Sequence, residues 1–297
     1  MDLLKEMNDA LTYIEENLED DLDMAEVAKI ARCSEFHFKK MFSYLAGITL
    51  LEYVRRRRLT MAGFELKGQP RKVIDVAVKY GYHSPDSFAK AFYQLHGINP
   101  SEVNKTGKSL KSFPRMTFQL TITGGSELIY RIENKEAFTI AGIKERIPLV
   151  YKGENPAITE MLTKITGDVY SKLKSLANVE PFGGYSASFN IWERENEEKA
   201  ELDHLIGTAT TKNDLLDLDS LHVAASTWAI FTVFGIPADI QEVWKQIYAE
   251  WFPSSNYQLV EGPEILFTDR NSIGPNNKGE IWIPVEKKGN DSAMQLN

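Results

Sequence analysis

The sequence has little cysteine: among its 297 residues there is one, Cys33. A single cysteine excludes an internal disulfide and any zinc site built from several cysteines. The five histidines show no spacing typical of metal ligands, so we expect neither a metal nor another cofactor. The chain also lacks a nucleophile elbow and a glycine-rich phosphate loop ahead of a helix, the common motifs of hydrolases and nucleotide-binding enzymes.

Long hydrophobic runs are missing as well. No apolar stretch approaches the roughly 18 residues that a membrane span requires, and the N-terminal stretch has no cationic start or apolar segment typical of a secretory signal. We therefore expect a cytoplasmic protein with no membrane partner. A chain of 297 residues exceeds what one compact core commonly holds, and we predict two domains.

Positive charge is scarce overall but concentrated in one part of the chain. The formal net charge is -8, yet residues 27–115 hold 17 Lys+Arg against 6 Asp+Glu, a balance of +11. Residues 1–26 carry -9 and residues 116–297 carry -10. This segregation indicates two parts of the chain with different partners.

The basic part contains one helical pattern twice. Apolar spacing predicts a first helix over residues 2–17, and Asp23 and Ser34 are placed to cap the two helices of a helix-turn-helix. About 48 residues later, Gly81 supplies the turn of a second such pair, and Ser84 opens its second helix. The equivalent positions in the two copies are Ala28 and Ala77, Phe38 and Phe88, Phe42 and Phe92, and Gly47 and Gly97. Two copies in register predict an all-α domain of two helix-turn-helix modules.

Four consecutive arginines lie in the helix that joins the modules, where Thr49 can act as the cap. Four successive residues sweep about 300° around a helix, so they cannot all face one phosphate backbone. We expect at most two to contact DNA and the others to pair with the acidic first helix. The candidate counter-ions are Glu15, Glu16 and Glu19.

This part of the chain resembles the AraC/XylS family of transcription regulators. The resemblance rests on "VAKIARCSEFHFKKMFSYLAGITLLEYVRRRRLTMA" and "VIDVAVKYGYHSPDSFAKAFYQLHGINPSEV". Arg58 and Ala62 match the family's "RxxxA", whereas Asn104 stands where the family often has arginine. The resemblance implies that both recognition helices enter successive major-groove segments of double-stranded DNA. The DNA-binding candidates are Phe36, Lys39, Lys40, Arg55, Arg58, Pro85, Asp86, Ser87 and Lys90. For each lysine, a phosphate contact or a solvated position is the alternative to reading a base.

Beyond residue 107 the pattern changes. We predict a DNA-binding domain over residues 1–107, a polar and flexible linker over 108–120, a second domain over 121–288 and a disordered tail over 289–297. Apolar patterns in the second domain predict strands over 137–147, 182–192, 203–211, 226–235, 263–268 and 280–285. Two longer amphipathic stretches, 155–176 and 238–252, predict helices. The order βαββ occurs twice, which predicts an α+β domain with helices on one face of an antiparallel sheet.

This second part resembles the GyrI-like effector-binding domains, on "HLIGTATT", "STWAIFTVFG", "VWKQIYAEWFPSSNYQLVEGPEI" and "EIWIPV". The resemblance implies a cleft for a small molecule, and aromatic walls in an acidic domain favour a hydrophobic or cationic ligand. The ligand-binding candidates are Tyr185, Phe189, Trp192, His204, Trp228, Trp251, Glu264 and Trp282. For each aromatic residue, packing in the core is the alternative. Leu266 stands where several relatives have a buried glutamate, which argues against strong selection for cations.

Together the two parts predict a ligand-responsive transcriptional regulator that is not an enzyme. Its expected partners are double-stranded DNA and a small-molecule effector, with RNA polymerase as a further candidate. Two other functions remain open. Some GyrI-like domains are hydrolases, and Glu193, Glu201 or His204 is a candidate general base. Alternatively, the second domain binds a partner protein.

Overall fold

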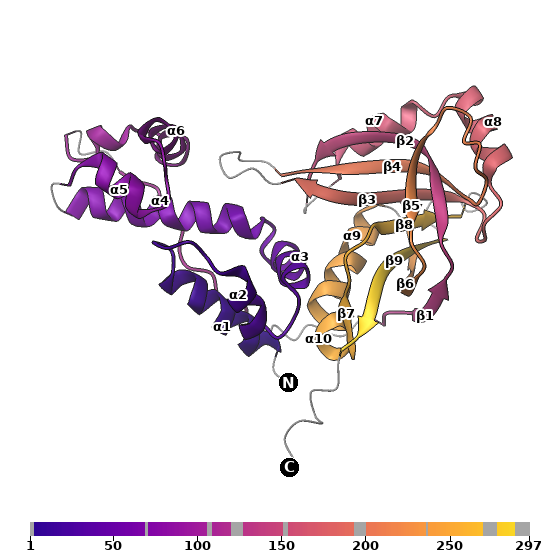
Figure 1. The fold of residues 1–297 in the computed structure, drawn as a ribbon, viewed down its shortest axis with the longest axis horizontal. Coiled ribbons are helices and arrows are strands. Elements are labelled where there is room, and N and C mark those ends of the chain that lie inside the picture. The colour runs from indigo at the N-terminus through magenta and orange to yellow at the C-terminus, as the bar shows by residue number, and fades with distance from the viewer. Residues whose placement is uncertain are drawn as a thin grey trace, which may run out of the picture. The chain divides into compact units, whose positions relative to one another are not determined.

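The computed structural model describes residues 3–68, 71–105, 109–119, 127–150, 154–192, 200–235, 237–269 and 278–288. The chain forms two compact units, whose described parts are residues 3–119 and residues 127–288. The first unit is helical and the second is built on a large sheet (Figure 1). The predicted tail over 289–297 lies outside the described residues.

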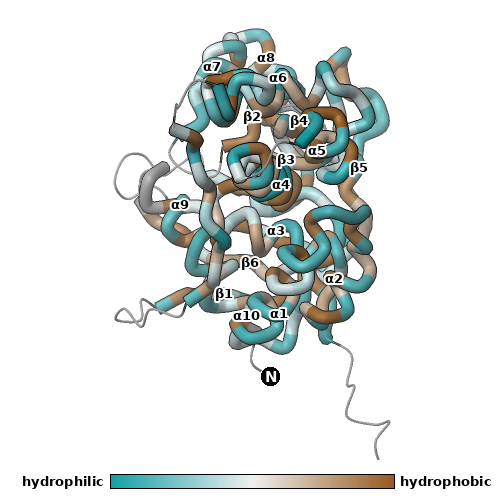
Figure 2. Tube along the Cα trace, turned by 90° about the vertical axis from the view of Figure 1, so that its left-hand side faces the viewer, coloured by the Kyte–Doolittle hydropathy of each residue, from teal (hydrophilic) through white to brown (hydrophobic). Residues whose placement is uncertain are grey.

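The first unit contains two helix-turn-helix pairs joined by a long helix. Its elements are α1 (Leu3–Glu16), α2 (Met24–Ile30), α3 (Glu35–Ala46), α4 (Leu50–Gly68), α5 (Val73–Lys79), α6 (Pro85–His96) and a short 3₁₀ turn (Pro100–Glu102). The predicted caps are confirmed: Asp23 accepts a hydrogen bond from the Ala25 amide, and Ser34 accepts one from the His37 amide. Hydrophobic and hydrophilic residues alternate along these helices, as their apolar spacing requires (Figure 2).

The turns of the two helix-turn-helix pairs have the same backbone conformation. Arg32 and Gly81 both adopt left-handed conformations, with φ of 50° and 81°. In each turn the next amide donates to a buried alanine carbonyl, from Cys33 to Ala28 at 3.1 Å and from Tyr82 to Ala77 at 2.9 Å. The equivalence of the two modules that the sequence predicts therefore extends to individual backbone hydrogen bonds.

Residues 109–119, here called the docked segment, lie along the helices of the first unit. The expectation of a flexible linker is wrong for these residues, because backbone groups of the segment bond to helix side chains. The Phe113 amide donates to Thr60 Oγ1 at 3.1 Å, and the Met116 amide donates to the Tyr53 hydroxyl at 3.1 Å. Asn8 exchanges two hydrogen bonds, each 2.9 Å long, with the backbone of Phe118. The segment is thus held at three points along its length, although none of its residues is buried, and it belongs to the helical unit.

The second unit is an antiparallel sheet with helices. Its strands are β1 (Tyr130–Lys135), β2 (Phe138–Pro148), β3 (Gly184–Trp192), β4 (Glu201–Thr210), β5 (Asp219–Val223), β6 (Ser226–Phe234), β7 (Tyr257–Leu259), β8 (Glu264–Thr268) and β9 (Lys278–Lys287). Eight strands lie in the order β1-β6-β9-β8-β3-β4-β2-β5, and β7 pairs with β9. The sequence predicted β2, β3, β4, β6, β8 and β9 but missed β1, β5 and β7, which are short or carry many charges.

The helices of this unit differ from the prediction in one respect. Residues 155–176 form two helices, α7 (Pro156–Thr163) and α8 (Gly167–Leu176), instead of one. The break falls at Ile165 and Thr166, two β-branched residues followed by a glycine, which are weak helix formers. Ile165 packs against a hydrophobic cluster that includes Ile206 of the sheet. The second helical stretch comprises α9 (Pro237–Gln246), a π-helical turn (Ile247–Trp251) and α10 (Phe252–Ser254).

The two faces of the sheet pack against different groups of residues. Because side chains alternate along a strand, Leu202 and Ile206 of β4 face Met161 of α7, whereas Leu205 and Ala209 face the opposite side. Leu205 and Ala209 belong to a core cluster that contains several aromatic residues. We call these the helix face and the aromatic face.

Candidate functional site

The recognition helices α3 and α6 bury one side and expose the other. Phe38 and Phe42 of α3, and Phe88 and Phe92 of α6, are fully buried. The exposed positions include Lys39 of α3, as well as Pro85, Asp86 and Lys90 of α6, while Phe36, Lys40 and Ser87 are half-buried. Lys39 pairs with Glu35 at 3.8 Å, and Lys40 lies over the ring of Tyr44. Seven of the nine DNA-binding candidates therefore lie at or near the outer surface of these two helices.

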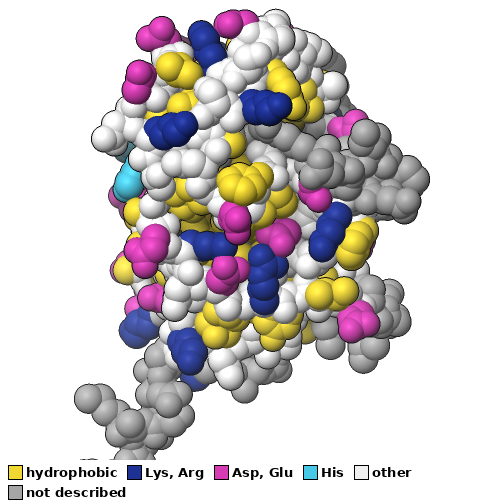
Figure 3. Space-filling view, turned by 90° about the vertical axis from the view of Figure 1, so that its right-hand side faces the viewer, with side chains coloured by type: hydrophobic (Ala, Val, Ile, Leu, Met, Phe, Trp, Pro, Cys, Tyr) yellow, Lys and Arg dark blue, Asp and Glu magenta, His cyan; other side chains and the backbone are white. Residues whose placement is uncertain are grey.

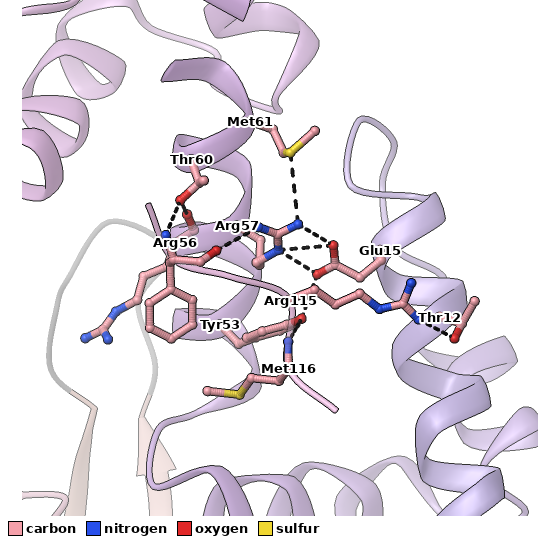
Figure 4. Close-up of polar contacts among 10 residues, drawn as sticks. Thr12, Glu15, Tyr53, Arg56, Arg57, Thr60, Met61, Arg115 and Met116 are labelled. Atoms are coloured by element: carbon pink, nitrogen blue, oxygen red, sulfur yellow. Dashed lines mark hydrogen bonds and ion pairs between the residues drawn. The ribbon is translucent and has the colours of Figure 1, made fainter. Parts of the chain in front are cut away.

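The arginine run has a different environment. Arg57 forms a bidentate ion pair with Glu15 of α1, with distances of 2.7 and 2.8 Å, and donates to the Phe113 carbonyl of the docked segment (Figure 4). The Tyr53 hydroxyl donates to the same carboxylate at 2.6 Å. The predicted pairing of the run with α1 is confirmed for Glu15. Burial raises the pKa of the Glu15 carboxyl, but the hydrogen bonds from Arg57 and Tyr53 outweigh it and hold the pKa below its ordinary value.

The two arginines predicted to contact DNA also have intramolecular partners. Arg55 is 8% exposed and donates two hydrogen bonds to Glu52, and Arg56 pairs with the same carboxylate and lies over the ring of Phe113. Arg58 donates to the Leu18 carbonyl at 2.8 Å and to the Asp20 carbonyl at 2.7 Å. A methyl group at Gly81 would come within 2.9 Å of the Arg58 guanidinium, so this arginine also fills the space beside the second turn.

The aromatic face holds a group of five rings, here called the aromatic cluster. Its members are Phe138, Tyr185, Trp228, Phe267 and Trp282. Trp282 is its centre, with ring centroids 5.7 Å from Tyr185, 6.1 Å from Trp228 and 6.4 Å from Phe138. Burial raises the pKa of the Tyr185 phenol, and the charge of Glu280 raises it further. Trp228 and Trp282 are each 1% exposed.

Four charged side chains accompany the aromatic cluster. Arg131 pairs with Glu280 at 2.9 Å and with Glu133 at 3.1 Å, and Lys135 pairs with Glu133 at 2.6 Å. Glu280 also accepts a hydrogen bond from the Trp282 indole at 2.8 Å. Charged and hydrophobic side chains lie side by side on the surface of the molecule (Figure 3). These residues were not among the predicted site residues, because β1, which carries three of the four, was not predicted from the sequence. The available signal was the alternation of charged residues along β1.

Three of the predicted ligand-binding residues, Tyr185, Trp228 and Trp282, come together in the aromatic cluster, and Phe189 packs against the same core. Trp251 instead packs against Phe231, with ring centroids 5.0 Å apart. The side chain of Trp192 lies outside the described residues, as does the whole of Glu193.

His204 and Glu264 face away from the aromatic cluster. Their strand neighbours Leu205 and Ile265 belong to the core on the aromatic face, so strand alternation places His204 and Glu264 on the helix face. Glu264 accepts a hydrogen bond from the buried Tyr248 hydroxyl. The prediction that Glu264 shares a face with Leu266 agrees with this alternation.

His204 lies between two serine hydroxyls of β3. Its Nε2 is 2.7 Å from Ser186 Oγ, and its Nδ1 is 2.9 Å from Ser188 Oγ. Burial lowers the pKa of His204 to about 4, so the ring is neutral at pH 7. A neutral imidazole donates through one nitrogen and accepts through the other, which suits two hydroxyl partners.

The described residues contain no group of three or more histidine, cysteine or acidic side chains arranged to hold a metal ion. Within the same ranges, no helix combines the length and the apolar character needed to cross a bilayer.

Comparisons with known proteins match both parts of the chain. The GyrI-like small molecule binding domain matches residues 129–286, and a helix-turn-helix domain matches residues 27–106. The HTH-type transcriptional activator AarP of Providencia stuartii is 38% identical over 95 residues, which are 32% of this chain and 70% of AarP. The regulatory protein SoxS of Escherichia coli K12 is 32% identical over 98 residues, 33% of this chain and 92% of SoxS.

Solved structures resemble each part more remotely. The structure of SAV2435 bound to tetraphenylphosphonium covers 53% of this chain and 94% of its own, at 17% identity and a TM-score of 0.44. A transcriptional regulator with an AraC-type DNA-binding domain from Chromobacterium violaceum covers 34% and 89%, at 20% identity and a TM-score of 0.32. With both domain matches in place, the chain belongs to the AraC family of bacterial transcriptional regulators and carries a GyrI-like small-molecule binding domain C-terminal to its helix-turn-helix domain.

Proposed function

We propose that this protein is a ligand-responsive regulator in which a small hydrophobic effector, bound at the aromatic cluster, changes how the helical unit binds promoter DNA or contacts RNA polymerase. The observation that supports the proposal is that one chain contains both a helical DNA-binding unit and a second unit with the aromatic cluster. One part presents two equivalent recognition helices, and the other gathers five aromatic rings beside four charged side chains.

In the DNA-binding unit, the exposed residues of α3 and α6 are the proposed contacts. Lys39 and Lys90 can donate to guanine edges or to phosphates, and Asp86 can accept from the cytosine amino group. Arg55 and Arg58 have a structural role in this proposal, because their guanidinium groups already bond to Glu52 and to the carbonyls of Leu18 and Asp20.

The effector unit is best understood as two copies of one βαββ motif. β2, β4 and β3 lie in the sheet in the same relative order as β6, β9 and β8, and the two sets meet at the β3–β8 pair. The strand that precedes each set, β1 or β5, pairs with the first strand of the other set. A pseudo-twofold arrangement of this kind is what a duplicated motif would produce.

Ligand titration of the full-length protein tests the proposed function, with two measurements on the same sample. All five tryptophans lie between residues 192 and 282, so a saturable change in tryptophan emission must arise in the effector unit. The effector should then change the affinity for the protein's own promoter DNA. By linkage, the DNA should change the affinity for the effector by the same factor.

Two outcomes would contradict the regulator function. A ligand that saturates the emission change but leaves both DNA affinity and transcription unaltered would show that the two units are not coupled. A ligand that is consumed with turnover would favour the hydrolase alternative. As a control, Phe182→Ala removes an exposed aromatic residue of the same unit, and it should leave the titration as it is in the parent protein.

A further inference from the structure

Lys135 occupies the position over the central ring of the aromatic cluster where a ligand cation would bind. Its Nζ lies over the Trp282 ring, 5.0 Å from the centroid. A cation above an indole is stabilised by the negative face of the ring, and tryptophan is the strongest such partner among the side chains. The Lys135 side chain is only 19% exposed. The chain therefore supplies its own cation to this ring.

The carboxylates beside the cluster are also already neutralised. Glu133 accepts from Lys135 at 2.6 Å, and Arg131 bonds to both Glu133 and Glu280. The hydrogen bond from Lys135, opposed by burial, holds the pKa of Glu133 below its ordinary value. Two cations and two anions leave no net negative charge in this group, so an organic cation would have to displace one of the chain's own cations.

Hydrogen-bond donors in the cluster, by contrast, are in excess. The Trp228 indole N–H is buried and finds no acceptor among the described residues. A buried donor without a partner costs free energy that a ligand acceptor would recover. The Lys135 ammonium carries three protons, and a ligand oxygen near Trp282 would meet this positive group.

We propose that the aromatic cluster selects uncharged or anionic aromatic effectors that carry a hydrogen-bond acceptor, and that Lys135 is the residue that discriminates against organic cations. The inference rests on the proposed effector function and narrows its ligand class. Removing the Lys135 charge should leave the Trp282 face open to a cation and leave Arg131 alone to compensate the two carboxylates, Glu133 and Glu280.

Two probes of the same shape and opposite charge test this inference in the full-length protein. Tetraphenylphosphonium is the cation, tetraphenylborate is the anion, and triphenylphosphine oxide serves as a neutral probe with an acceptor. Binding is measured by calorimetry and by tryptophan emission. Lys135→Met should raise the affinity for the cation about tenfold and lower the affinity for the anion, because the ring face is released and the group gains a net negative charge.

Two controls separate charge from folding. Lys135→Arg keeps the charge and should retain the probe preference of the parent protein. Lys164→Met removes a lysine that pairs with Glu145 at 2.8 Å elsewhere in the same unit, and it should change nothing. Lys135→Gln is the second neutral variant and should shift the preference in the same direction as Lys135→Met.

The outcomes distinguish this inference from the proposed function. If triphenylphosphine oxide binds saturably but the ratio of cation to anion affinity stays within about twofold in both neutral variants, Lys135 is not the discriminating residue. Tighter binding of the cation than of the neutral probe to the parent protein would overturn the inference as well. If none of the three probes binds saturably to any variant, the effector site itself is rejected, and the inference falls with it.

Discussion

At the scale of single residues, the four arginines all bond within the helical unit, and Arg55 and Arg57 are buried there. The Glu15 carboxylate joins α1 to Arg57 and Tyr53 of α4, and these two side chains in turn bond to the backbone of the docked segment. A buried carboxylate that loses its charge leaves the facing guanidinium without compensation, and this costs more than the intact pair contributes. The four arginines face two carboxylates, Glu15 and Glu52, and Arg58 bonds to neutral carbonyls, so the run holds helices together and is only partly neutralised.

Glu15→Gln should accordingly destabilise the helical unit by about 2–4 kcal/mol, because Arg57 keeps its charge but loses its counter-ion. Urea unfolding of residues 1–123, followed by circular dichroism, measures the loss. The pKa of Glu15 is lowered on folding, so its contribution is present above the ordinary carboxyl pKa and is lost as the pH falls through the folded value. Below about pH 4.5, the stability of Glu15→Gln should therefore fall less steeply with decreasing pH than the stability of the parent protein. An unchanged stability would show that the pair contributes nothing net.

His204 predicts an acid-sensitive effector unit. Its pKa falls from 6.5 to about 4 on folding, so between these values the unfolded chain binds more protons and the folded state loses stability as the pH decreases. The loss should be at most about 1.4 kcal/mol per pH unit. Tryptophan emission during urea unfolding reports it, since all tryptophans lie in this unit. His204→Gln should flatten the dependence between pH 6.5 and 4, whereas His222→Gln, at an exposed position, should not. Equal slopes in all three proteins would refute the assignment.

At the scale of elements, the docked segment extends the helical unit beyond the predicted domain end. Phe118 packs against Phe42 of α3, with ring centroids 5.9 Å apart, and its backbone bonds to Asn8 of α1. Any movement of residues 109–119 must break contacts with α1, α3 or α4. The segment thus offers a physical route by which a change downstream can reach the helices that position α3.

Residues 1–107 should therefore be less stable than residues 1–123. Phe118→Ala in the longer fragment should cost about 2 kcal/mol, since a half-buried ring is lost, and should lower the melting temperature by roughly 10 °C. Ser112→Ala, at an exposed position in the same segment, is the matched control. Melting is followed by circular dichroism. If both fragments melt at the same temperature, the docked segment does not contribute to the fold.

At the scale of the whole molecule, two cores of different character lie in one chain. The first unit is helical and contains none of the five tryptophans, and the second is a sheet that contains them all. The basic balance of residues 27–115 also contrasts with the acidic remainder. Each unit buries its own hydrophobic cluster, so each is expected to unfold as a unit of its own.

Thermal unfolding of the full chain should accordingly show two transitions by circular dichroism but only one by tryptophan emission. Promoter DNA should raise the temperature of the transition that tryptophan does not report, and an effector should raise the other, since each ligand stabilises the state to which it binds. Coincident single transitions by both probes, with or without DNA, would show that the two units unfold as one.

The sequence by itself determined the elements whose causes are local. Asp23, Ser34 and Ser84 cap helices through their own neighbours, and Gly81 supplies the left-handed turn. The repeat of this pattern identified the helix-turn-helix modules, and alternation in apolar strands identified most of the sheet. Such signals need only residues a few positions apart, so they can be read without a fold.

Only the tertiary structure decided what the charged and aromatic residues do. Glu15 is 42 positions from Arg57, and Arg131 is 149 positions from Glu280, so no local pattern could pair them. Strand pairing placed Trp228 and Trp282 on one face of the sheet and His204 and Glu264 on the other. The ligand-binding residues predicted from the sequence therefore do not form a single site. The physical reason is that a side chain's role depends on the desolvation and the partners it meets after folding, and these are properties of contacts between distant parts of the chain.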